Sequence, residues 1–157
     1  MSNYSKAGLR SVGNYQAAGW PFITGSADLD QNVCHRVDFP SVTRSVTVIN
    51  TNTTNGYDIR VHFQGGAASA SFGGNYDTGG HQAIADTDDV IARKQYVTVP
   101  AGYGSLTMDI KCKHLFISHN AGSFSNLTYQ VFAELTGIPT GSMPHLTGSG
   151  ITGIPVL

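Results

Sequence analysis

The segment that decides the fold reads RSVTVIN (44–50), TNTTNGY (51–57) and DIRVHFQ (58–64). Apolar side chains fall on every second position of the first and third pieces, which is the period of a strand with one buried face. Asn55-Gly56 in the linker tolerates positive φ and favours a turn. We therefore predict an antiparallel hairpin over residues 44–64, with further strands closing a sandwich around it.

Strand signals recur along the rest of the chain. Pro21 gives the first of these segments the character of an edge strand or anchor. About seven to nine strands, with turns roughly every ten residues and no helical pattern between them, predict an all-β, antiparallel β-sandwich. We expect a jelly-roll topology first and an immunoglobulin-like one second, because periodicity does not separate them. Beyond the central segment, the predicted strands lie at 20–24, 32–39, 90–100, 105–113, 114–119 and 127–135.

The composition of the 157-residue chain fits one β domain with few exposed helices. It has a single glutamate, Glu134, and four lysines, the residues that usually cover helix surfaces. The formal net charge is -1 and no basic run exceeds two residues, so we expect no nucleic-acid partner. Charged residues make up 12% of the chain, against a usual share of about 25%, which suggests a surface partly covered by partners.

Targeting signals are missing from the sequence as read. The first residues contain no apolar stretch of the kind found in signal peptides. The longest uncharged run, 136–157, is interrupted by glycine and proline, so we expect no membrane association. Cys34 and Cys112 form no metal or redox motif. Two buried thiols and a disulfide both remain open for this pair.

Three regions follow from these patterns: an N-terminal arm at 1–18, a sandwich domain at 19–135 and an extended C-terminal tail at 136–157. The arm is either disordered or lies on a neighbouring subunit. The tail contains no Asp, Glu, Lys or Arg and repeats the text TGIP at 136–139 and 152–155. It either folds back on its own domain or lies on another subunit. The residues predicted to make subunit or shell contacts are Tyr4, Leu9, Tyr15, Ile138, Leu146 and Ile154.

Catalytic motifs do not stand out. A zinc-protease motif, a nucleophile elbow, a phosphate loop and a dinucleotide motif are all missing, so we predict no catalytic residues, no cofactor and no metal. A pair of carboxylates for glycoside hydrolysis remains open. The acidic run Asp86–Asp89 reads as a solvated turn, with a calcium loop as the alternative. The six scattered histidines read as structural, with a metal on a trimer axis as the alternative.

Aromatic residues in loops offer a different function. Phe72 and Tyr76 lie in the glycine-rich segment 65–80, and Tyr103 lies between two glycines. Such side chains can stack on sugar rings, although turn packing or subunit contact is the more common explanation for loop aromatics. These three residues are our candidates for a ligand-facing site.

Four pieces of sequence resemble small structural proteins of marine tailed phages, among them capsid decoration (cement) proteins. They are PSVTRSVTVIN (40–50), DIRVHF (58–63), KCKHLFIS (111–118) and VFAELTGIP (131–139), and the resemblance covers roughly residues 20–155. It implies a β-sandwich that oligomerises on a virion assembled in the host cytoplasm, and it brings no functional residues with it. We therefore expect a non-enzymatic decoration or minor capsid protein that forms a homo-oligomer, most simply a trimer, and binds the major capsid protein. The alternative is a carbohydrate- or receptor-binding sandwich on a phage capsid surface or tail.

Overall fold

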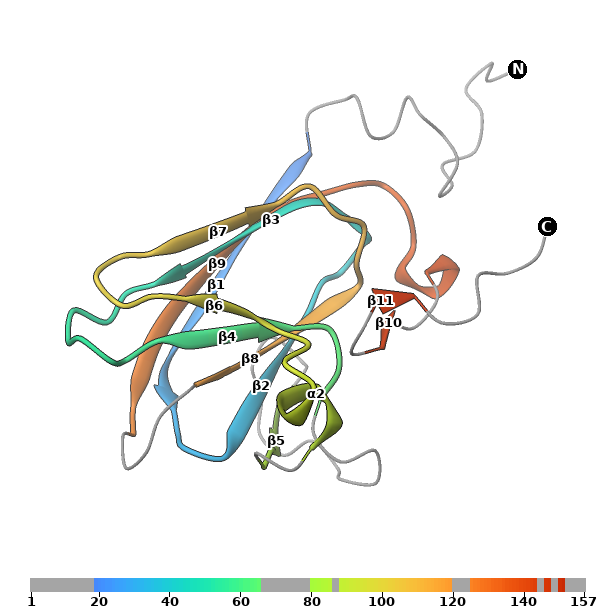
Figure 1. The fold of residues 1–157 in the computed structure, drawn as a ribbon. Helices are drawn as coiled ribbons and strands as arrows, with labels where there is room; N and C mark the ends of the chain where they lie inside the picture. Colours follow the sequence, from blue (N-terminus) through green and yellow to red (C-terminus); the bar gives the residue numbers. More distant parts are fainter. Residues whose placement is uncertain are drawn as a thin grey trace, which may run out of the picture.

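The regular structure is almost entirely β (Figure 1). It comes from a computed structural model that describes residues 19–65, 80–85, 88–119, 125–143, 146–147 and 150–151. No helix in this part of the chain is long and apolar enough to cross a bilayer. The main strands are β1 (Trp20–Leu29), β2 (Val33–Asp38), β3 (Thr43–Asn50), β4 (Ile59–His62), β5 (His81–Ala83), β6 (Val97–Val99), β7 (Ser105–Met108), β8 (His114–His119) and β9 (Leu127–Leu135). The short elements are helix α2 (Asp89–Ala92), the 3-10 helix η1 (Thr140–Ser142), β10 (Leu146–Thr147) and β11 (Gly150–Ile151).

Two antiparallel sheets pack together, so the predicted β-sandwich is confirmed. Sheet A has the strand order β1-β9-β3-β7, and sheet B has the order β5-β2-β8-β4-β6. Every strand pair within them is antiparallel. A separate two-stranded ladder joins β10 and β11 in the tail.

The pairing is nested like one long hairpin. Strand β4 pairs with β6, β3 with β7, β2 with β8 and β1 with β9. Successive pairs fall in alternate sheets, so most connections carry the chain from one sheet to the other. Because each of these pairs joins residues far apart in sequence, the sandwich is held by long-range contacts that local patterns do not specify.

The core lies between the two sheets and is made by alternate residues of each strand. Val46 and Val48 of sheet A face the same interior as Ile59 and Val61 of sheet B, and all four are at most 2% exposed. His35 of β2 reaches across to the hydroxyl of Tyr129 on β9 at 3.0 Å. This buried polar contact joins the two sheets through the core. Other members of the core are Leu29, Val37, Phe39, Val99, Cys112, Leu115, Ile117, Leu127, Val131, Ala133 and Leu135.

The predicted central hairpin is wrong. Strand β3 pairs with β7 and β9 in sheet A, whereas β4 pairs with β6 and β8 in sheet B. The turn over Thr54–Tyr57 does form, with the Tyr57 amide donating to the Thr54 carbonyl at 3.2 Å. The linker is nevertheless long enough to carry the chain between sheets, and tight hairpin pairing needs a much shorter connection. The alternation of apolar residues identifies the buried face of a strand but does not determine which other strand pairs with it.

The other predicted strands are recovered to different degrees. Strand β9 spans the predicted 127–135, β8 spans 114–119, and β2 falls within 32–39. The segment 90–100 is a strand only at Val97–Val99, because its first part forms α2. There the Asp88 carbonyl accepts from the amides of Ile91 and Ala92 at 2.9 and 2.8 Å, which starts a helical turn. Strand β7 ends at Met108, short of the predicted 113.

The start of the tail folds back on its own domain. The Thr136 amide donates to the Val42 carbonyl at 2.8 Å, and the Val42 amide donates to the Ile138 carbonyl at 2.9 Å. Ile138 is 0% exposed. Farther on, Lys113 Nζ donates to the Met143 carbonyl at 3.3 Å. As far as Met143, therefore, the fold-back alternative describes the tail.

Candidate functional site

The outer face of sheet A carries exposed apolar side chains. Ile23 is 74% exposed and Phe132 is 37% exposed. Trp20, at the start of β1, is 73% exposed, but it pairs with the core residue Leu135 and so lies on the opposite side of the strand from Ile23. Ile23 of β1 and Phe132 of β9 are direct cross-strand partners. Their neighbours in sequence point inward: Phe22 packs edge-on against Phe39 at 5.4 Å between ring centroids, and Val131 is fully buried. The exposure of Ile23 and Phe132 therefore follows from strand alternation.

The rest of this face is polar and mostly uncharged. The row that contains Ile23 and Phe132 continues through Thr47 of β3 to Thr107 of β7. The hydroxyls of Thr47 and Thr107 lie 2.9 Å apart. Acidic and basic residues within the four strands are confined to Asp28, Arg44 and Glu134. Arg44 and Glu134 pair at 3.7 Å toward one end of the sheet. We call this surface the open face, defined by Ile23, Phe132, Thr47 and Thr107.

Strand β1 borders the open face and is an edge strand of sheet A. Edge strands present backbone donors and acceptors to other chains, and proteins usually shield them with charges, prolines or bulges. Residues 20–27 of β1 carry no charge, and Pro21 removes one backbone donor. A register shift between Ser26 and Leu29 disrupts the far end of the strand. The Trp20 end is the part of this edge best suited to contact another molecule.

The outer face of sheet B, in contrast, is covered by the chain itself. A second cluster of buried residues forms there from Cys34, Ile84, Val90, Ile91 and Phe116, with Tyr96 packed against it. Cys34 and Phe116 alternate with the core residues His35 and Ile117, so they point away from the sandwich interior. The segment containing α2 supplies the cover (Figure 1).

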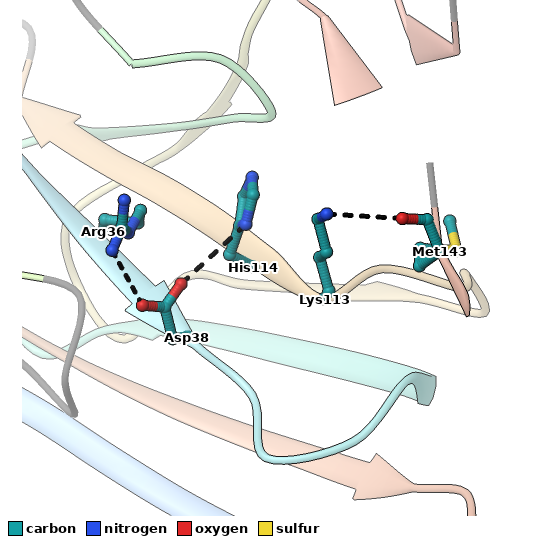
Figure 2. Close-up of polar contacts among 5 residues, drawn as sticks. All are labelled: Arg36, Asp38, Lys113, His114 and Met143. Carbon is teal, nitrogen blue, oxygen red and sulfur yellow. Dashed lines mark hydrogen bonds and ion pairs between the residues drawn. The ribbon is translucent and has the colours of Figure 1, made fainter. Parts of the chain in front are cut away.

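Charged and aromatic side chains on sheet B are paired with one another. Figure 2 shows Arg36 and His114 on either side of Asp38. The Arg36 guanidinium lies 3.0 Å from one carboxylate oxygen of Asp38, and His114 Nδ1 lies 3.8 Å from the other. The Arg60 guanidinium stacks over the Tyr96 ring at 4.8 Å. These contacts are typical of a structural surface network.

Three histidines of sheet B are buried, His35, His62 and His119, and the first two have clearly shifted pKa values. His62 contacts the Ser118 hydroxyl through Nε2 at 2.9 Å and stacks on Phe116. Burial lowers the pKa of His62 to about 4, and burial likewise lowers the pKa of His35 to about 4. Both imidazoles are therefore neutral at pH 7 and serve as hydrogen-bonding parts of the fold.

Metal and redox chemistry have little support in the described residues. Within them, no group of three or more His, Cys, Asp or Glu side chains is placed to hold a metal ion. Asp88, from the acidic run, accepts a hydrogen bond from the Ala85 amide at 2.8 Å and so stabilises a turn. Cys34 and Cys112 are both buried thiols that form no disulfide, and burial raises the pKa of the Cys112 thiol to about 11. A thiol of that pKa is a poor nucleophile at pH 7.

The predicted contact residues are placed unevenly. Ile138 is buried in its own domain, so it is not available for the shell contact predicted for it. Leu146 lies in β10, where only its backbone is described. Tyr103 is 65% exposed, as expected of a ligand-facing aromatic. The other predicted residues lie outside the described part of the chain, and they are Tyr4, Leu9, Tyr15, Phe72, Tyr76 and Ile154.

The open face was missed at the sequence level, although its signal was present. Phe132 stands in the outward row of β9 among Thr128, Gln130 and Glu134, where an apolar side chain is out of pattern. Ile23 stands next to Pro21 in a segment already read as an edge strand or anchor. Only the pairing of β1 with β9 brings the two together.

Comparisons with known proteins add no family to this description: the chain matches no protein-family model, no curated protein and no solved structure.

Proposed function

We propose that this chain is a non-enzymatic structural protein of a virion, a capsid decoration or minor capsid protein that associates with copies of itself and binds the capsid shell. The resemblance of the strand sequences to structural proteins of marine tailed phages supports this role. The strand order supports it as well. Nested pairing of β1 with β9 through to β4 with β6, divided between two four-stranded halves with β5 added at one edge, is the arrangement expected of a jelly roll. Viral capsid domains and lectin domains commonly use that topology.

One observation carries the proposal: the open face exposes Ile23 and Phe132, carries a single ion pair toward one end, and borders the edge strand β1, whose first residue Trp20 is also exposed. Interface cores are depleted of charged residues and enriched in aromatic ones, and large exposed apolar groups gather where proteins associate. A shell protein repeats its contacts many times, so modest contacts at each copy add up across a particle. The open face has the composition that such a repeated contact needs.

Self-association and shell binding can be tested through the cross-strand pair. The double variant Ile23→Glu/Phe132→Glu places two carboxylates on the open face. We expect it to fold normally, to sediment as a monomer where the parent protein sediments as an oligomer, and to lose co-sedimentation with shells of the major capsid protein. Charges brought together at a desolvated interface oppose association strongly.

The matched control is Val97→Glu. Val97 is also an exposed apolar residue on an edge strand, at 48% exposure, but it lies on β6 of sheet B. We expect this variant to behave like the parent protein in both assays. The proposal is contradicted if the parent protein sediments as a monomer and does not bind the shell. It is also contradicted if the double variant still binds the shell.

A further inference from the structure

Tyr103 occupies a backbone conformation that aromatic residues avoid. Its φ is 62°, and it sits between Gly102 at φ 83° and Gly104. Residues with a Cβ rarely adopt such angles, and a bulky side chain there is an outlier that local context must stabilise. Its ring nevertheless projects into solvent, with 65% of the residue exposed. Backbone strain at a residue whose ring is exposed to solvent is more typical of a binding site than of a packing contact.

Hydrogen bonds to the neighbouring β3–β4 segment fix the position of the turn that carries Tyr103. The Gly102 amide donates to the Asn52 carbonyl at 2.7 Å, and the Ala101 amide donates to the Asp58 carboxylate at 2.9 Å. The Asn50 amide donates to the Gly104 carbonyl at 2.9 Å. Gly104 is also required sterically, because a Cβ there would lie 2.3 Å from the Pro100 carbonyl oxygen. The ring is therefore presented by a rigid support, which lowers the entropy lost on binding.

The support itself is a buried amide network. Asn50 donates through Nδ2 to the carbonyls of Tyr57 and Val99 at 2.8 and 3.0 Å. Asn52 donates through Nδ2 to Asn50 Oδ1 at 2.7 Å and to the Thr128 carbonyl at 2.9 Å. The network ties the β3–β4 loop to the β6–β7 turn and to β9. These two connections lie side by side at one end of the sandwich (Figure 1).

The chemistry around the ring is polar, and its one carboxylate, Asp58, already accepts a hydrogen bond from the Ala101 amide. The adjoining loop exposes Thr53, Thr54, Asn55 and Gly56, and none of these carries a charge. The other large exposed hydrophobic side chains in the described residues are Trp20, Ile23, Val97 and Phe132, and all of them lie on strands. A protein-binding hot spot is usually surrounded by further packed contacts that exclude water. A single aromatic face among hydroxyl and amide groups instead matches a sugar ring, which is apolar on one face and hydroxylated at its rim.

We propose that the tip formed by residues 52–57 and 101–104 binds neutral polysaccharide, with Tyr103 stacking on a sugar ring and the threonine and asparagine side chains hydrogen-bonding its hydroxyls. This site is separate from the open face, and the proposal does not depend on the virion role.

Binding is tested by titrating the isotope-labelled full chain with maltohexaose, laminarihexaose and chitohexaose and following backbone amide shifts. We expect at least one sugar to bind with a dissociation constant on the order of 1 mM and to shift the amides of the tip while leaving those of the open face unchanged. Three substitutions accompany the titration. Tyr103→Phe keeps the ring, Tyr103→Gly removes it, and Lys94→Gly replaces another exposed residue with positive φ, at 54°, away from the tip.

Tyr103→Gly should weaken binding by about tenfold, the scale of one lost aromatic contact, whereas Tyr103→Phe and Lys94→Gly should leave it within about threefold. Because glycine adopts this φ without steric conflict, Tyr103→Gly should unfold at the same temperature as the parent or higher. Unchanged tip amides with all three sugars overturn the proposal. So does equal binding by Tyr103→Gly, and so do tip shifts that depend on protein concentration alone, which would assign the tip to contacts between copies.

Discussion

The two outer faces of the sandwich differ in what covers them. On sheet B, Ile84, Val90 and Ile91 close over Cys34 and Phe116, and the nearby charges are paired. On sheet A, strands of similar alternation leave Ile23 and Phe132 exposed in a row that is otherwise threonine. The chain thus shields one outer face with its own residues, whereas Ile23 and Phe132 on the other stay exposed. The difference is the main physical reason to look for assembly contacts on sheet A.

The largest expected effect comes from matched substitutions of the two outward-facing phenylalanines. Phe116→Ala on β8 empties a position that is 5% exposed, so we expect the free energy of unfolding to fall by about 3–5 kcal/mol. Phe132→Ala on β9 removes a ring that water already reaches, and the isolated protein should change by less than about 1 kcal/mol. Urea denaturation of the dilute protein measures both. Equal losses at the two positions would mean that the faces are equally covered.

Acid should affect the two sheets differently. All five histidines in the described residues lie on strands of sheet B: His35, His62, His81, His114 and His119. The folded-state pKa values of His35 and His62 are lowered from 6.5 to about 4, so protons bind the unfolded chain more readily than the folded one. The contribution of these two histidines to stability is therefore complete above pH 6.5 and falls as the pH drops toward 4, by on the order of 3 kcal/mol for each histidine.

Hydrogen exchange at pH 7 and pH 5 checks this assignment, because local opening raises exchange in the strands concerned. We expect β2, β4 and β8 to lose protection before β3, β7 and β9. The variant His62→Gln keeps a neutral polar group next to Ser118 and should flatten part of the pH dependence of unfolding. Loss of protection that begins in sheet A would contradict the proposed origin of the acid sensitivity.

A smaller effect is expected from shortening the tail. A chain that ends at Leu135 loses Ile138 and the hydrogen bonds to Val42, so the free energy of unfolding should fall by at least about 2 kcal/mol. A chain that ends at Met143 keeps these contacts and should be as stable as the parent. Thermal and urea unfolding of the two truncated proteins distinguishes the cases. If both are equally stable, the fold-back segment contributes nothing measurable to the domain.

Local sequence patterns were enough to find most strands and their buried faces. Strand β9 follows the predicted 127–135 because five apolar residues alternate through it without interruption. The strand predictions failed where a short apolar run is compatible with both a strand and a helical turn. Val90 and Ile91 are adjacent and both buried, which a helical turn permits and a strand with one buried face does not. The hydrogen bonds that the Asp88 carbonyl accepts from the amides of Ile91 and Ala92 hold this helical turn.

Pairing could not be predicted in the same way. The predicted hairpin placed β3 beside β4, yet their partners β7 and β8 lie roughly fifty residues or more along the chain. The open face depends on that long-range pairing, because Ile23 and Phe132 meet only through the register of β1 with β9. The Tyr103 tip depends on a φ angle, and its flanking glycines in the sequence did not reveal that the tyrosine itself has a positive φ.

The most direct test uses Trp20, the only tryptophan in the chain, which is 73% exposed at the border of the open face. Its fluorescence quenching by acrylamide can be compared between the dilute protein and the protein assembled on capsid shells. We predict strong quenching in the dilute protein and marked protection on the shell, with Ile23→Glu/Phe132→Glu quenched strongly in both mixtures. Equal quenching of the parent protein, free and in the presence of shells, would contradict the claim that the open face is where this molecule is covered by its partners.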